Sequence, residues 1–462
     1  MNTPIGITKA LAIWAAETPV ITSELAIHRA SEVIYDIMGC TIAGCEDAGV
    51  RTLKEVALQQ ESGRATVFGA QKKLSAPWAA LVNGMSAHAL DYDDNFLPGL
   101  THASAVLFPA LLALGEEEHA SGKDLIDALI IGLEVQSVVG RGVNRNHNNA
   151  GWHSTSTVGV IGAAAACGRL LKLSSAQMVN AMSLAVSMAS GPKIQFGTMA
   201  KPFHAGMAAK NGILAARFAQ AGMEGSDCAL EGAMGFRDLY AGNNAQGWEP
   251  LIAHIGQPLA IEEFGFSLKL YPCCGSSHKV VDNVIALKEQ YAFNAQDVEK
   301  VETLVEYVNQ QNLMYSAPIS EMEARFSMNY CVAVALMAGQ LQLSDFTQSA
   351  IERPEIRALF PLVSMEAYPQ HACDKDPTKR LPHSVKITLK NGDVYERASQ
   401  WAKGTIHNPM SERELAEKFK HCCQHVLPEE TMVALQQMLA NVMNIEDIRD
   451  MSLHLDVMHT HR

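Results

Sequence analysis

Apolar side chains recur at helical spacing over about the first 260 residues. The clearest case follows Thr22-Ser23-Glu24, where a capping residue precedes apolar positions from Leu25 to Ala43. Similar spacing predicts helices over residues 75–90, 103–119, 123–138, 157–171, 175–190 and 205–220. Several are apolar on all faces and rich in Ala and Gly, so we expect them to pack closely inside a core of other helices.

The pattern changes after about Phe264. A run rich in β-branched residues predicts a strand over 301–308, and residues 362–368 are a second candidate. Residues 384–389 and 394–397 alternate in polarity around Asn391-Gly392, which predicts a β-hairpin. Helical patterns return over residues 411–427 and 428–443. We therefore expect a mainly α protein, with a large helical domain over 1–264, completed by 405–462, and a smaller α+β domain over 265–404.

Length and composition restrict the class of protein. A chain of 462 residues is too long for a typical single core, which agrees with two domains. The composition, 48% hydrophobic and 18% charged, is that of a globular protein. The net charge is −13 and no run of Lys and Arg stands out, so we expect neither nucleic acid nor an anionic membrane as a partner.

Cysteine usage and the N-terminus favour a reduced, cytoplasmic protein. The 10 cysteines have no framework spacing and no CxxC pair, so the sequence predicts neither disulfides nor a structural zinc site. The N-terminal segment lacks a basic region and a clear cleavage site. No apolar run reaches the roughly 18 residues of a membrane span.

The segment from His88 to His102 gathers three carboxylates and two imidazoles between apolar, helix-like stretches. Crowded carboxylates shift one another's pKa values, and burial adds to the shift. Such groups are candidates for proton transfer or for metal binding. The alternative is a solvated acidic loop that caps the next helix.

Three further segments place polar groups inside small, apolar sequence. They are GWHSTS at 151–156, AKPFHAG at 200–206 and KLYPCCGSSH at 269–278. Each stands at or just before a predicted helix start, where backbone N–H groups and the helix dipole favour anionic ligands. The pattern indicates a site for an anionic molecule.

Together these motifs resemble the MmgE/PrpD family. The matching pieces are HALDYDDN…TH, GWHSTSTVG, KPFHAGMAAKNG, KLYP and the segment RFSMNY at 325–330, and they follow the family's order over nearly the whole chain. The resemblance implies a cofactor-free enzyme for small di- or tricarboxylates, with a helical domain and a smaller α+β lid. It also implies a homodimer, which the all-round apolar helices between Ala103 and Gln220 favour as well.

The family's activities leave the reaction open, because it includes 2-methylcitrate dehydratase, cis-aconitate decarboxylase and iminodisuccinate epimerase. The resemblance implies a lyase that works by proton abstraction or donation, with dehydration or decarboxylation as its reaction. An epimerase of an iminodisuccinate-like dicarboxylate and a non-catalytic carboxylate-binding protein are the alternatives. A metal-dependent hydrolase could use Asp91, Asp93, Asp94 and His102, provided that these carboxylates lie in a loop.

The resemblance to the family's decarboxylases implies a role for six residues. It implies that His153 and Tyr330 exchange protons, that Asp91 orients His102, and that Lys201 and Lys269 neutralise substrate carboxylates. Asn95 and His204, in the matched motifs, complete the expected substrate-binding set. Asn95 stands where the decarboxylases have Thr, and Cys274 replaces a His.

Each candidate also has a structural alternative. Asp91 or Asp94 can cap a helix, and His153 can be a buried hydrogen-bonded histidine. Lys201 can be a solvated lysine at a helix start, and Tyr330 can be a core tyrosine.

Two further features of the sequence bear on cofactors. Cys273 and Cys274 are interpreted as packing residues, because the sequence shows no base beside them. It also shows no phosphate-binding Gly loop and no metal-ligand cluster, so neither a cofactor nor a metal is expected.

Overall fold

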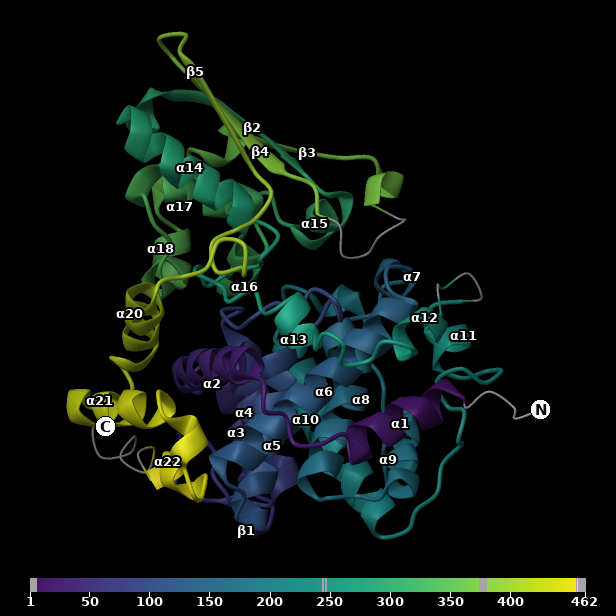
Figure 1. Cartoon of the computed structure of the whole chain (residues 1–462). Helices are drawn as coiled ribbons and strands as arrows, with labels where there is room; N and C mark the ends of the chain where they lie inside the picture. The colour runs from purple at the N-terminus through teal and green to yellow at the C-terminus, as the bar shows by residue number, and fades with distance from the viewer. Residues whose placement is uncertain (1–5, 243–244, 246, 374–379, 454, 456–462) are drawn as a thin grey trace. The chain divides into compact units, whose positions relative to one another are not determined.

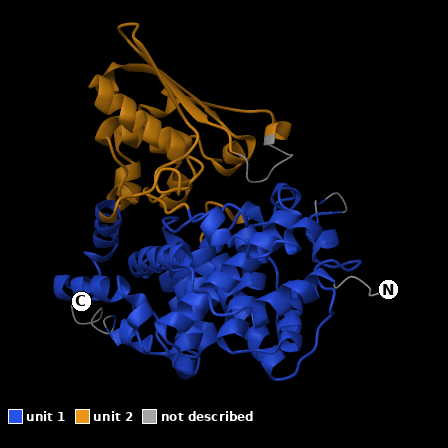
Figure 2. Cartoon of the chain, viewed as in Figure 1, with its two compact units in different colours: residues 1–194, 200–266, 413–462 blue, residues 195–199, 267–412 orange. Residues whose placement is uncertain are grey.

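The computed structural model describes residues 6–242, 245, 247–373, 380–453 and 455. The chain is mainly α with a small four-stranded sheet, which confirms the predicted fold class (Figure 1). It forms two compact units (Figure 2). Unit 1 comprises Met1–Ile194, Ala200–Phe266 and Arg413–Arg462, and unit 2 comprises Gln195–Met199 and Ser267–Glu412.

Unit 1 consists of packed helices with one short strand. Its longer helices are α1 (Ile7–Glu17), α2 (Glu24–Gly44), α3 (Ala48–Ala57), α4 (Ala76–Ala89), α5 (Ala103–Glu118), α6 (Gly122–Val143), α8 (Ser154–Leu170), α9 (Ser175–Ser187) and α10 (Ala200–Gln220). Shorter elements are β1 (Ser62–Ala65), α7 (Asn146–Asn149), α11 (Phe236–Tyr240), α12 (Glu249–Ile252) and α13 (Ala260–Glu263). The C-terminal segment returns with α20 (Glu412–Cys423), α21 (Glu429–Leu439) and α22 (Arg449–Leu453).

The predicted start of the helix after Ser23 is confirmed. Ser23 caps α2, because its hydroxyl accepts from the backbone N–H of Ala26. α10 begins at Ala200, earlier than the expected residue 205, and so takes Lys201 and Pro202 into its first turn. Proline is tolerated there, because the first backbone N–H groups of a helix have no intrahelical partner.

Glycines allow α4 and α10 to pack with their backbones in contact. A Cβ atom on Gly206 would lie 2.2 Å from the carbonyl oxygen of Leu81, and one on Gly84 would lie 2.8 Å from Cα of Gly206. α10 also packs against α8, and α5 packs against α4 and α8. This close approach brings the C-terminal end of α4 beside the N-terminal end of α10, where His88 and Lys201 lie.

Unit 2 contains a four-stranded sheet in the order β3-β2-β4-β5. The strands are β2 (Val298–Val305), β3 (Val363–Ala367), β4 (His383–Leu389) and β5 (Val394–Ser399). β2 pairs parallel with β3 and antiparallel with β4, and β4 and β5 form an antiparallel hairpin. Gly392 in its turn has φ +93°, which confirms the predicted Asn-Gly turn.

The strand predicted over 301–308 is wrong at its end. β2 stops at Val305, and Tyr307–Asn312 form the short helix α15. Glu306 interrupts the ladder, because its backbone N–H donates to His383 Nε2 and its carboxylate accepts from the N–H of Leu381. The residues beyond it therefore lack a neighbouring strand to pair with.

The remaining helices of unit 2 are α14 (His278–Tyr291), α16 (Glu321–Arg325), α17 (Met328–Ala338), α18 (Gln348–Ile351) and α19 (Pro354–Arg357). α14 packs against β4, β5 and α17, so that Val281, Val334 and Ile387 share one apolar core. Among the described residues, no helix is both long and apolar enough to cross a membrane.

The contact between α4 and α10 gives a first prediction. Gly206→Ala places a methyl group against the backbone of Leu81, so we expect the free energy of unfolding to fall by about 3 kcal/mol. Chemical denaturation measures this change. The matched control is Gly159→Ala on α8, whose new methyl would meet the Val106 side chain at 3.3 Å and can be accommodated at lower cost. Equal losses in the two variants would contradict the backbone contact.

Candidate active site

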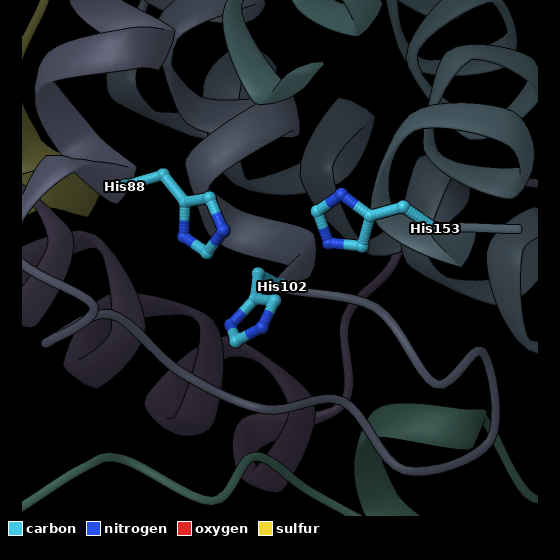
Figure 3. A group of neighbouring side chains, drawn as sticks. All are labelled: His88, His102 and His153. Carbon is cyan, nitrogen blue, oxygen red and sulfur yellow. The ribbon is translucent and has the colours of Figure 1, made fainter. Parts of the chain in front are cut away.

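Four helix ends of unit 1 bring together the polar residues of three sequence motifs. His88 lies in the last turn of α4, His102 and His153 are the N-cap residues of α5 and α8, and Lys201 lies in the first turn of α10. The three imidazole rings lie close together (Figure 3). The ring centre of His88 is 4.3 Å from that of His102 and 5.9 Å from that of His153. Three helix N-termini therefore direct their positive dipole ends at one place, which favours an anion.

Lys201 is the buried cation of this cluster. Its Nζ forms an ion pair with Asp91 and lies 2.8 Å from Nε2 of His88. On the other side of the ring, Nδ1 of His88 lies 2.8 Å from Oδ2 of Asp93. All four side chains are at most 2% exposed, so Lys201 is not a solvated lysine. The result is a continuous polar chain from Asp91 through Lys201 and His88 to Asp93.

The loop between α4 and α5 gives its carboxylates different tasks. Asp91 adopts a left-handed conformation with φ 51°, which turns the chain back toward the end of α4. Asp94 caps α5, because its carboxylate accepts from the N–H groups of Ala103 and Ser104 and from the Ser104 hydroxyl. The capping alternative therefore holds for Asp94. Burial, together with the charge of Asp93, raises the pKa of Asp94 to about 7.

His102 is held by the same loop. Its Nδ1 lies 2.8 Å from the carbonyl oxygen of Asp94 and 3.5 Å from Oδ2 of Asp93. Because a carbonyl oxygen only accepts, Nδ1 of His102 carries a proton. The Nδ1 hydrogen bond of His102 goes to the main chain of Asp94, and the orienting role of Asp91 remains a prediction.

His153 and His204 form a histidine pair. Their Nδ1 atoms lie 3.1 Å apart, so one ring must donate a proton and the other must accept it. Burial and the nearby Lys201 hold the pKa of His153 well below its usual value. Burial, with His88 and Lys201 nearby, lowers the pKa of His204 to about 4. Both rings are therefore neutral near pH 7, and the pair has room for one additional proton.

Two other helices of unit 1 fix the main chain of the loop. Nζ of Lys418 on α20 donates to the carbonyl oxygen of Tyr92 at 2.8 Å and pairs with Asp36 of α2 at 2.7 Å. The thiol of Cys40 donates to the same carbonyl oxygen. Because Tyr92 lies between Asp91 and Asp93, these contacts hold both carboxylates in place.

The remaining candidates lie beside the loop or in unit 2. Asn95 is half-buried in the loop before α5, and Lys269 is buried in unit 2. Tyr330 lies on α17, where its hydroxyl donates to the carbonyl oxygen of Asp345 and its ring packs edge-on against Phe346. Burial raises the pKa of Tyr330 to about 12.

The two adjacent cysteines also lie in unit 2. Cys273 is fully buried and belongs to the core of that unit, while Cys274 is half-buried and packs against the same core. Burial raises the pKa of the Cys273 thiol well above its usual value. A protonated thiol is a poor nucleophile, so this environment agrees with a packing role.

The fold brings together four residues that could hold a metal ion. Single ligand atoms of His88, Asp91, Asp93 and His102 lie within 4.8 Å of one another. Imidazole and carboxylate donors together suit several divalent metals. The ammonium group of Lys201, however, already contacts two of these four residues and places a positive charge among them.

Sequence reasoning missed the roles of His88 and Asp93. Both stood in the conspicuous motif, yet His88 was given no role and Asp93 appeared only in the metal-hydrolase alternative. The contact of His88 with Lys201 joins residues far apart in sequence, and no local pattern reports it.

Comparisons with known proteins identify the class of protein that carries this fold and this buried polar cluster. Residues 9–249 match the MmgE/PrpD N-terminal domain and residues 271–442 match the MmgE/PrpD C-terminal domain. The chain belongs to the MmgE/PrpD family and is a lyase of that type.

Several relatives cover nearly all of the chain. It is 31% identical over 437 residues to the cis-aconitate decarboxylase of Homo sapiens, an alignment that covers 91% of this chain and 88% of that protein. It is 30% identical to the Mus musculus enzyme of the same name, with 92% and 88% covered. It is 26% identical to the cis-aconitate decarboxylase of Aspergillus terreus, with 97% and 95% covered.

Proposed function

We propose that this lyase decarboxylates a small unsaturated tricarboxylate of the cis-aconitate class without a cofactor. The observation that carries the proposal is the buried Lys201 ammonium beside His102 and His153 at three converging helix N-termini. Such a site combines a cation, backbone dipoles and proton-transfer groups, which is what a polycarboxylate substrate needs. The names of the relatives in mammals and Aspergillus support the substrate class.

The proposed reaction breaks one carbon–carboxylate bond and releases CO₂. The electron pair of that bond stays on the carbon chain and spreads toward a remaining carboxylate. Lys201 and the helix dipoles stabilise this negative charge, and a histidine then donates a proton to carbon. Solvent returns the proton to the histidine, so the enzyme is unchanged at the end of the cycle.

His153 and His102 are the proposed proton carriers. His153 is neutral in the empty site, but an arriving polycarboxylate adds negative charge beside it and favours its protonated form. One proton already lies between the Nδ1 atoms of the His153–His204 pair, so the added proton would lie on an Nε2 atom. Lys269 as a second carboxylate-binding residue and Tyr330 as a second proton-exchange residue remain predictions.

Dehydration of a 2-methylcitrate-like acid and epimerisation of an iminodisuccinate-like acid use similar proton transfers and are the alternative reactions. NMR in heavy water separates all three on a panel of cis-aconitate, 2-methylcitrate, citrate and aspartate-derived acids. We expect cis-aconitate to be consumed and a dicarboxylate with deuterium on carbon to form. Binding without turnover of any acid would instead support a carboxylate-binding protein.

Independence from a metal is a separate prediction. Because Lys201 places a positive charge inside the His/Asp cluster, we expect turnover to be unchanged after dialysis against EDTA. Metal analysis of the dialysed protein is the control. Loss of turnover that added Zn²⁺ or Mn²⁺ restores would contradict this expectation.

His153→Gln tests the proton carrier. Glutamine roughly preserves the size and one hydrogen bond but removes a group that titrates near neutral pH. We expect turnover to fall by about 10²- to 10⁴-fold with little change in melting temperature. His28→Gln, at an exposed histidine of α2, is the control. A His153→Gln enzyme with at least about half of the wild-type turnover, far above this loss, would move the assignment to His102 and Tyr330.

The quaternary state is also a proposal. We propose a homodimer formed through the helical unit, because apolar side chains such as Met223, Met234 and Leu239 are exposed there. Light scattering at micromolar concentration is expected to give twice the mass of the 50.0 kDa chain. A monomeric mass would show this proposal to be wrong.

A further inference from the structure

We propose that the buried Asp93–His88 pair is a positioning device that aims the ammonium group of Lys201 at a substrate carboxylate. The task of Lys201 rests on the proposed function, whereas the arrangement of the three side chains does not. His88 and Asp93 had no role in the expected site. Their geometry assigns one.

His88 is placed to act on Lys201 and not on a substrate. Its side chain and that of Asp93 are 0% exposed, and the two ring nitrogens face Asp93 and Lys201 at 2.8 Å each. Both hydrogen-bonding atoms of the ring are therefore engaged within the protein. His88 is a positioning residue and not a catalytic one.

The hydrogen bonds fix where the protons lie. A carboxylate accepts, so Nδ1 of His88 carries the proton that is donated to Asp93. Nε2 then has a lone pair and accepts from the ammonium group of Lys201. A protonated ring would set an N–H against an ammonium group at 2.8 Å. Burial lowers the pKa of His88 and agrees with the neutral ring.

Two hydrogen-bond acceptors orient the ammonium group of Lys201, whereas a single acceptor would leave it free to rotate. A lysine side chain is long and flexible, and a carboxylate alone holds it as a point charge. With Asp91 on one side and Nε2 of His88 on the other, two of the three N–H bonds of Lys201 have fixed directions. The left-handed turn at Asp91 and the last turn of α4 place these two acceptors around one point.

Two other interpretations make different predictions. A resident metal ion could use His88, Asp91, Asp93 and His102, but it would have to displace the ammonium group from between them. A proton relay from Asp93 through His88 to Lys201 would need an imidazole ring that titrates. A positioning device needs only an acceptor at the place of Nε2.

Two substitutions of His88 by amide side chains of different length separate these interpretations. The amide of His88→Gln extends to the place of Nε2 and can accept from Lys201. The amide of His88→Asn ends near the place of Nδ1, so it can stay with Asp93 but does not reach Lys201. The same two substitutions at His147 are the control, because this buried histidine bonds Thr157 and the carbonyl oxygen of Tyr240.

Calorimetric affinity for tricarballylate, a saturated tricarboxylate without the reactive double bond, is the main measurement. We expect His88→Gln to bind within about threefold of wild type and His88→Asn to bind about 10- to 100-fold more weakly, as for loss of an oriented charged hydrogen bond. The value of kcat/KM should follow the same order. Both His147 variants should bind like wild type.

Equal affinity in the Gln and Asn variants overturns the positioning role. Equal loss of kcat in both variants with unchanged affinity overturns it in favour of a relay. The proposal is overturned in favour of a metal site if zinc binds to wild type and restores its turnover, and if His88→Asn removes this binding.

A second measurement is independent of substrate. In ¹⁵N-histidine-labelled protein, the signals missing in His88→Gln identify His88. We expect the neutral tautomer with the proton on Nδ1 between about pH 6 and 8, where an ordinary histidine titrates. An imidazolium or a proton on Nε2 overturns the proposal. If wild type binds no tricarboxylate, the proposed function fails, while this measurement still decides the arrangement of His88.

Discussion

A buried ammonium group holds the centre of unit 1 together. Lys201 lies among helices rich in Ala and Gly, where an uncompensated charge would cost several kcal/mol. Asp91 and His88 compensate it, and Asp93 in turn fixes the ring of His88. These contacts join the end of α4, the loop after it and the start of α10, so one charge sets the position of three chain segments.

That charge can be held there because the helices approach so closely. Gly84 and Gly206 let the backbones of α4 and α10 touch, which a residue with a side chain would prevent. The helix dipoles of α5, α8 and α10 then act at the same place as the ammonium group. The small residues of the core and the polar residues of the site are therefore parts of one arrangement.

Under the proposed function, the protonation of the histidines in this cluster depends on the charge of the substrate. Burial and the charge of Lys201 hold the pKa of His153 well below its usual value, and its partner His204 has a pKa of about 4. The proposed polycarboxylate substrate would reverse the balance, because it would bring several negative charges next to rings that burial has deprotonated. Substrate binding would in this way prepare the proton donor, which links recognition to chemistry within one cluster.

The sequence determined the mainly α class, the long helices, the hairpin at Asn391-Gly392 and the family, because periodicity, caps and motifs are local signals. It also singled out Asp91, His102, His153, Lys201 and His204, which the fold brings into one cluster. Tertiary structure alone decided the partners of these residues. Asp94 caps α5, Asp91 pairs with Lys201, and His88 joins Lys201 to Asp93, since contacts between helices far apart in sequence depend on packing that no local pattern encodes.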